Sequence, residues 1–257
     1  MLKKYGFFLL VLHSFLGFAQ TNPWPGIDAQ GGNWVTTEGL DALTGNPAGL
    51  SSLESSVYAL ASSQQYGLPE LSSAFAGVAT PLLSGAVGFS VQQFGFQKAY
   101  REQSLTIGYA RSLDKNLKMG ARFRYLGQQV QEVGRNGGWA FQLGLLATIR
   151  EELLLGVALG QGKREQTHYG KQQTLVMGLG LAYQPSDKAR LQLMLEKQLE
   201  TPPQLKLGFR YQWKRRLWLM AGFTSTPLQS TFGLGLQISP SIQLETGLQW
   251  HQPLGWT

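Results

Sequence analysis

The sequence predicts an all-β fold, an antiparallel transmembrane β-barrel of about 14 strands (12 to 14) with short periplasmic turns and longer extracellular loops. Thirteen stretches of roughly ten residues alternate apolar with small or polar side chains after residue 54, and the connections between them alternate in length. A strand that faces lipid needs an apolar residue at every second position, and the sheet must close to satisfy its backbone hydrogen bonds. Both observations favour a protein of the bacterial outer membrane.

The order of residue types at the N-terminus predicts a secretory signal peptide. Lys3 and Lys4 precede an apolar run of about 13 residues that ends in small residues at Ala19. A membrane-spanning helix would need roughly 20 apolar residues. We expect residues 1–19 to be cleaved as a signal peptide, and the mature chain to be exported to the cell outer membrane.

Residues 20–54 differ from the remainder of the chain. They are rich in Gly, Asn and Pro and contain no long alternating run. We interpret them as an N-terminal segment that is periplasmic or inserted into the lumen as a plug. Residues 55–257 are then the outer-membrane β-barrel.

The alternating stretches differ in strength. Residues 55–63 and 71–80 are weak, Ala-rich candidates, whereas 86–94 alternates Val87 and Phe89 with small or polar residues. Later stretches keep the period of two that side chains have along a strand. The remaining predicted strands are 104–112, 117–125, 139–147, 153–159, 175–183, 191–195, 205–213, 217–223, 232–238 and 242–250.

The strand predicted over 117–125 decides which register faces the lumen. One register is apolar, and the other carries Lys118, Arg122 and Arg124. An Arg or Lys that faces lipid at the bilayer midplane costs about 2 to 4 kcal/mol, so the charged register must face inward. Glycine recurs in the inward register of later strands, which lets the wall curve and leaves room for whatever fills the interior.

Connection lengths predict the orientation of the strands. One set is short, and the other is longer and more polar, as at 128–138, 161–171 and 198–203. Short turns lie on the periplasmic side of bacterial barrels, so odd-numbered strands run outward. Thirteen strands would then end outside, although such barrels have an even number. We therefore expect a closing strand, which residues 251–257 begin or which the segment near 33–37 replaces.

Aromatic residues gather near the predicted strand ends, where amphipathic rings suit the headgroup boundary of a membrane. A general preference of aromatic residues for strands is the alternative explanation. The residues assigned to this girdle are Tyr109, Tyr125, Trp139, Tyr183, Tyr211, Trp213, Trp218 and Trp250.

Inward-facing cations would make the lumen basic and would require counter-charge. The acidic residues of the N-terminal segment supply it if that segment folds into the barrel as a plug. A hydrated basic pore lining is the alternative. The cations are Lys118, Arg122, Arg124, Lys206 and Arg210, and the acidic candidates are Asp28, Glu38, Asp41 and Glu54.

The composition argues against catalysis and cofactors. There is no Cys, and only His168 and His251 remain after signal removal, so no paired catalytic or metal-binding set is evident. Loss of Lys3 and Lys4 reduces the 22 basic residues to 20 against 15 acidic ones, a net charge of +5 without any basic helix. We expect no enzyme activity, no cofactor, no metal and no nucleic-acid partner.

The string Gly45-Asn46-Pro47-Ala48-Gly49-Leu50 stands immediately before the first predicted strand. Asn-Pro initiates turns and Gly permits close backbone approach, so an ordinary turn is one explanation. In position and spelling the string also resembles the Asn-Pro-Ala-Gly motif of the FadL-like outer-membrane superfamily. Asn46 and Pro47 are therefore candidate functional residues of the lumen.

A closer resemblance is to the PorV/PorQ-like barrels of Bacteroidetes, which are associated with the type IX secretion system. Besides residues 45–50 it rests on the strings at 66–72, at 94–96 with 100–102 following, and at 250–255, and it covers most of the mature chain. It implies an integral outer-membrane protein that is an accessory or component of type IX protein secretion. The expected partners are outer-membrane lipid and type IX secretion components or secreted proteins.

Two alternatives remain. One is a FadL-like channel for the uptake of hydrophobic small molecules, in which the N-terminal segment acts as a hatch. The other is a purely structural outer-membrane protein. A transporter would show a contiguous apolar pocket in the lumen near Asn46 and Pro47.

Overall fold

The computed structural model describes residues 25–95, 100–131, 134–166, 170–199, 201–251 and 255–256. The predicted signal peptide (1–19) and His168 lie outside the described residues. None of the helices in the described part of the chain has the length and apolar character of a membrane span.

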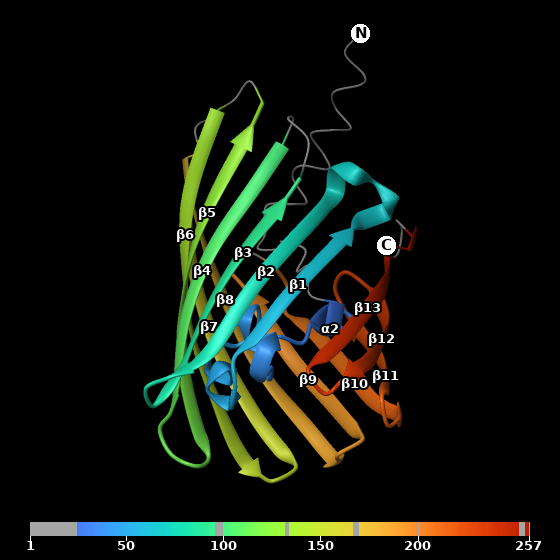
Figure 1. The fold of residues 1–257 in the computed structure, drawn as a ribbon. Coiled ribbons are helices and arrows are strands. Elements are labelled where there is room, and N and C mark those ends of the chain that lie inside the picture. Colours follow the sequence, from blue (N-terminus) through green and yellow to red (C-terminus); the bar gives the residue numbers. More distant parts are fainter. Residues whose placement is uncertain are drawn as a thin grey trace.

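One antiparallel sheet contains the fourteen described strands, and their spatial order is their order in the sequence. The sheet is a continuous series of hairpins that curls around the N-terminal segment (Figure 1). The all-β antiparallel prediction is therefore confirmed. The strands are β1 Val57–Gln64, β2 Ser72–Leu82, β3 Gly85–Phe94, β4 Tyr100–Ser112, β5 Leu117–Val130, β6 Gly134–Arg150, β7 Leu153–Gln166, β8 Gly170–Ser186, β9 Ala189–Gln198, β10 Gln204–Lys214, β11 Leu217–Thr224, β12 Gln229–Ser239, β13 Ile242–His251 and β14 Gly255–Trp256.

The two registers of the sheet differ sharply in exposure. On β4 the outward side chains of Leu105 and Ile107 are 49% and 53% exposed, whereas the inward Thr106 and Ala110 are 5% and 0% exposed. Large apolar side chains thus cover the outside of the sheet and small or polar ones its inside, the reverse of a water-soluble protein. Such an outer surface suits an apolar solvent.

Two of the three longer loops predicted above are largely strand in the structure. Most of 128–138 and 161–171 is strand, because β5 pairs with β6 as far as Val130 and Gly134, and β7 pairs with β8 as far as Gln166 and Gly170. These ends are polar, so no apolar alternation marks them, and backbone pairing alone extends the hairpins. The strands β6 and β8 have 17 residues each, against the 9 to 11 or so that cross a bilayer.

The ladder begins at β1 and ends, within the described residues, at the two-residue β14. The partners of β14 are Trp250 and His251 of β13, so it lies where a final strand was expected to begin. No pairing joins β14 to β1 in the described part of the chain. The alternative that residues 33–37 replace a closing strand is wrong, because these residues form no strand.

The N-terminal segment, residues 25–56, lies inside the curl of the sheet (Figure 1). It contains the short helix α2 (Pro25–Asp28) and the 3-10 helices η1 (Gly39–Leu43) and η2 (Pro47–Ser52). Two further 3-10 helices, η3 (Gln65–Gly67) and η4 (Pro69–Leu71), connect β1 to β2.

An apolar core forms where η1 and η2 meet β1 to β4. Leu43, Leu50 and Phe75 are 4%, 2% and 4% exposed in this cluster. Alanines of the inward register surround them, namely Ala59, Ala79, Ala86 and Ala110. The Ala-rich character that made the first two strands weak candidates is thereby explained, because small inward side chains leave room for the leucines of the segment.

Candidate functional site

The contact between the N-terminal segment and the sheet wall is the candidate functional site, and Asn46 lies at its centre. The Asn46 side chain is fully buried, and its Oδ1 accepts a hydrogen bond of 3.1 Å from the Ala48 amide at the start of η2. Its Nδ2 donates to the carbonyl oxygens of Val35 (2.7 Å) and of Leu145 on β6 (3.1 Å). One side chain thus caps η2 and fastens the segment to the wall.

Two glycines of the wall explain how the segment approaches so closely. A Cβ atom at Gly144 would collide with Asn46 Oδ1, and one at Gly120 would collide with the backbone of Pro47 and Ala48. The backbone of the segment therefore lies directly on the strands, which only glycine permits. The turn at Asn46 and Pro47 is therefore packed against the wall.

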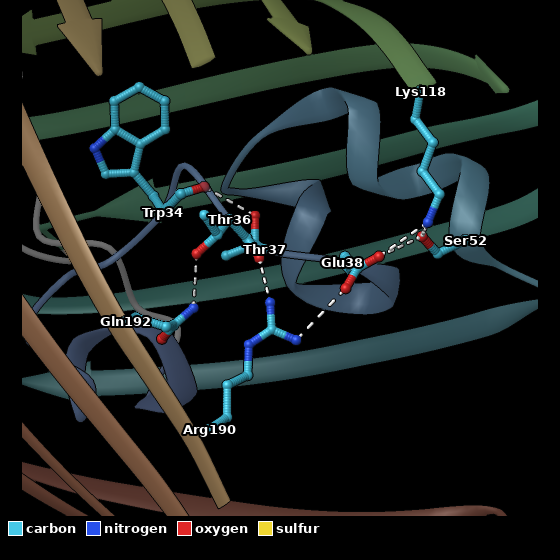
Figure 2. Close-up of polar contacts among 8 residues, drawn as sticks. All are labelled: Trp34, Thr36, Thr37, Glu38, Ser52, Lys118, Arg190 and Gln192. Atoms are coloured by element: carbon cyan, nitrogen blue, oxygen red, sulfur yellow. Dashed lines mark hydrogen bonds and ion pairs between the residues drawn. The ribbon is translucent and has the colours of Figure 1, made fainter. Parts of the chain in front are cut away.

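Glu38 is the acidic residue of the segment that meets one predicted lumen cation, Lys118, and a second cation that was not predicted, Arg190 (Figure 2). Its Oε1 accepts hydrogen bonds from Lys118 Nζ (2.9 Å) and Ser52 Oγ (3.1 Å), and its Oε2 lies 3.5 Å from Arg190 Nη1. Burial opposes ionisation of the carboxyl, but Lys118 and Arg190 outweigh it and hold the pKa of Glu38 below its usual value. The carboxylate is therefore charged at neutral pH.

Side chains of the wall also satisfy the backbone of the segment, which has little secondary structure of its own. Arg190 Nη2 donates to the Thr36 carbonyl oxygen at 2.6 Å, and Arg122 Nη1 donates to that of Leu43 at 2.8 Å. Thr224 on β11 donates to the Gly31 carbonyl oxygen at 3.1 Å. Buried backbone groups need such partners, so these inward polar residues position the segment.

Glu196, on β9, is a buried carboxylate that sequence reasoning missed. It is 5% exposed, and its Oε2 accepts hydrogen bonds from Trp34 Nε1 (2.6 Å) and Lys206 Nζ (2.8 Å). The counter-charge of Lys206 thus comes from a neighbouring strand. Trp34, from the N-terminal segment, shares the same carboxylate.

The remaining predicted cations also find partners on the wall. Arg210 Nη2 lies 3.4 Å from Glu245 Oε1, and its guanidinium lies 5.3 Å from the centre of the Trp218 ring. Arg124 is attracted by Glu102 on the adjacent strand β4. The assignment of Trp218 to the outer aromatic girdle is therefore wrong: its place in the inward register of β11 turns the ring towards Arg210.

The other acidic candidates of the segment have separate roles. Asp28 is half-buried in α2, and burial raises its pKa to about 8 against the opposing effect of Lys206. Asp41 in η1 lies close enough to Glu245 for the two like charges to interact. Glu54 is exposed, so its expected contribution to the lumen counter-charge is not found.

The missed residues share a recognisable pattern. Arg190, Gln192 and Glu196 occupy alternate positions of β9, in register with each other on the inward face. The predicted strand 191–195 was defined by its outward leucines alone. The opposite register, extended by one residue at each end of 191–195, contains all three as inward polar residues.

The site has no metal-binding set within the part of the chain that the structure describes. Among the described residues, no three His, Asp or Glu side chains gather in a way that could hold a metal ion. The polar side chains of the site instead pair with one another and with backbone groups. Their chemistry is that of a structural contact between two parts of one chain.

Comparisons with known proteins relate the fold to a class of channels. The sequence matches no protein-family model. It also matches no curated protein. Among solved structures, the Pseudomonas putida toluene transporter TodX is similar with a TM-score of 0.60 and 14% identity, over 87% of this chain and 91% of that chain.

Two further solved structures share the fold. The Ralstonia pickettii toluene transporter TbuX has a TM-score of 0.60 and 13% identity, over 88% of this chain and 92% of that chain. A Pseudomonas aeruginosa FadL homologue has a TM-score of 0.60 and 11% identity, over 87% of this chain and 88% of that chain. The described residues therefore have the fold of this group of transport proteins, at identities where fold alone is shared.

Proposed function

We propose that this protein is an integral outer-membrane β-barrel channel for the uptake of small hydrophobic molecules, with residues 25–56 as a plug. The observation that carries the proposal is the fold shared with hydrocarbon transporters. The apolar outer register supports it, because lipid is the solvent in which exposed Leu105 and Ile107 are stable. The barrel closes in the membrane, since unpaired edges of β1 and β13 would be costly in lipid.

The accessory role in type IX secretion has no comparable support. Of the strings behind that resemblance, residues 45–50 have a structural explanation in the cap that Asn46 provides. Residues 66–72 form η3, η4 and the start of β2, with Tyr66 at a positive φ of 53°. The structural likenesses favour the uptake channel, which therefore replaces secretion as the leading function.

Transport in this proposal requires the plug to move. The segment is packed on the wall at Asn46 and Pro47, so a molecule passes only when part of the segment leaves its seat. The contacts of Glu38 and Thr36 with the wall are polar, and water can replace them at small cost. Passage is then coupled to their rupture.

A reversible cross-link between plug and wall tests the proposal. The natural chain has no Cys, so Thr36→Cys with Gln192→Cys introduces a single thiol pair at a contact between the plug and β9 where the native side-chain atoms are 3.0 Å apart. Cells that lack other hydrophobic uptake channels would express this variant and be assayed for uptake of toluene and of a long-chain fatty acid. Bridging the thiols with a short reducible reagent should abolish uptake, and reduction should restore it.

A matched control joins two strands that are already paired. Leu143→Cys with Leu159→Cys links β6 to β7 on the outer face, and bridging this pair should leave uptake unchanged. Equal uptake by the bridged and reduced plug variants would contradict the role of the plug. Fractionation of the chain with the periplasm, or no uptake above that of cells without the protein, would contradict the channel itself.

A further inference from the structure

The short turns lie together at one edge of the sheet, which we call the short-turn rim. The turn between β10 and β11 is its basic corner. Lys214, Arg215 and Arg216 are consecutive and exposed, and no ion pair joins them to an acidic group within the described residues. The other charged turns of this rim mix both signs. Their charged residues are Asp114 and Lys115, then Arg150, Glu151 and Glu152, then Asp187 and Lys188.

A row of aromatic side chains lies along the outer face of β10 and ends at this corner. Phe209, Tyr211 and Trp213 occupy alternate outward positions and are 38%, 37% and 58% exposed. The rings of Phe209 and Tyr211 stack with centroids 6.2 Å apart and an interplanar angle of 7°. The apolar surface that faces lipid thus continues, ring by ring, to the edge of the membrane.

A β-bulge lies between the row of aromatic side chains and the three cations. The β10–β11 register shifts between Gln212 and Lys214, which leaves Trp213 outside the regular ladder. Lys214 Nζ lies 5.1 Å from the centre of the Trp213 ring, so the ammonium group is held beside the outermost ring. Gln212 Nε2 donates to the Arg215 carbonyl oxygen at 3.0 Å and fixes the turn that carries the other two cations.

We propose that this corner, Phe209 to Arg216, binds an anionic phospholipid of the leaflet next to the short turns. The phosphate and the charged headgroup contact Lys214, Arg215 and Arg216, and an acyl chain lies along Phe209 and Tyr211. Arg and Lys form charge-assisted hydrogen bonds with phosphate, and basic groups at a membrane surface attract anionic lipid. The proposal rests on the membrane insertion stated under the proposed function, but not on transport.

Brominated lipids supply the test, because bromine on an acyl chain quenches the fluorescence of a tryptophan that it touches. The protein would be reconstituted into phosphatidylcholine vesicles that contain brominated phosphatidylglycerol or, separately, brominated phosphatidylcholine. The Trp213 signal is the difference between the natural chain and Trp213→Phe. We expect phosphatidylglycerol to quench it at about tenfold lower lipid fraction than phosphatidylcholine.

Two triple variants separate a site from a general charge effect. Lys214→Gln with Arg215→Gln and Arg216→Gln should remove the preference for phosphatidylglycerol. The control, Lys115→Gln with Arg150→Gln and Lys188→Gln, removes the same charge from turns that contain acidic residues and should keep the preference.

Three results would overturn the lipid site. They are an equal loss of preference in both triple variants, equal quenching by both lipids in the natural chain, and stronger competition by lipopolysaccharide than by phosphatidylglycerol. A chain that inserts and takes up substrate without any lipid preference overturns this site alone. A chain that does not enter vesicles at all overturns both this site and the proposed function.

Discussion

The N-terminal segment is held on its two sides by different kinds of contact. Towards β1 to β4, η1 and η2 bury Leu43 and Leu50 against Phe75 and inward alanines. Towards β9 to β12, residues 29–38 are held by hydrogen bonds and ion pairs, such as those of Trp34 with Glu196 and of Thr36 with Arg190. We call the first the apolar seat and the second the polar seat.

The two seats respond to different conditions. Apolar burial has no dependence on pH and little on salt, whereas the polar seat depends on the charge of its carboxylates. The polar seat is also imperfectly satisfied, because Asn33 Oδ1, Gln192 Oε1 and Arg190 Nε are buried without a hydrogen-bond partner among the described residues. Movement of the segment should therefore begin at the polar seat while the apolar seat acts as the anchor.

The apolar seat should give the largest loss of stability. Leu50→Ala removes a side chain that is 2% exposed, and we expect it to lower the free energy of unfolding by about 2 to 5 kcal/mol because it leaves a cavity. Urea unfolding in detergent micelles measures this. Leu60→Ala, at an outward position that is 86% exposed, is the control and should change stability by about 0.5 kcal/mol or less. Equal effects of the two changes would contradict the anchoring role of the apolar seat.

Asn46 joins the two seats, and its substitution should cause the second largest loss of stability. Asn46→Ala removes the cap of η2 and leaves the carbonyl oxygens of Val35 and Leu145 without this donor, at an expected cost of about 2 to 3 kcal/mol. The effect is measured as the rate at which a protease cuts the chain within residues 25–56. Asn116→Ala, in an exposed turn, should leave that rate unchanged. No acceleration in Asn46→Ala would refute the fastening role.

Glu38 should reveal the acid sensitivity of the polar seat. Because its folded pKa is depressed, its contribution is present above the usual value of 4.5 and is lost as pH falls through the folded value. Glu38→Gln should cost about 1 to 2 kcal/mol at pH 7, and the difference from the natural chain should shrink in acid. Unfolding curves at several pH values test this, with the exposed Glu54→Gln as control. A constant difference across the pH range would contradict it.

Asp28 should give the smallest effect and the opposite pH dependence. Its folded pKa of about 8 lies above the usual 3.8, so its contribution is complete below pH 3.8 and is lost as pH rises towards 8. The full shift would correspond to roughly 6 kcal/mol, but Asp28 is only half-buried and solvent screens its charge, so we expect a loss on the order of 1 kcal/mol. Hydrogen exchange of residues 25–31 should quicken with pH in the natural chain beyond the intrinsic rate, and should not do so in Asp28→Asn. The exposed Asp187→Asn should behave like the natural chain.

Much of the wall could be predicted because its evidence is local. The charges of Lys118, Arg122 and Arg124 sufficed to assign the inward register of β5, and all three have inward partners. The polar ends of β5 to β8 could not be predicted, because pairing of their backbones leaves no apolar period. The partners of the lumen cations were predicted for Lys118 alone, since Glu196 and Glu245 lie on strands where only the outward register was considered.

The sequence by itself determined which side of each long strand is apolar, because contact with an apolar solvent acts on every second residue and leaves a period that can be read within one strand. Only the tertiary structure decided where the N-terminal segment lies on the inner face. Its contacts join residues far apart in the chain, such as Gly31 and Thr231, which are 200 positions apart. An alternating pattern shows that an inward side chain is polar. Which group that side chain contacts is determined by how the sheet curls around the N-terminal segment.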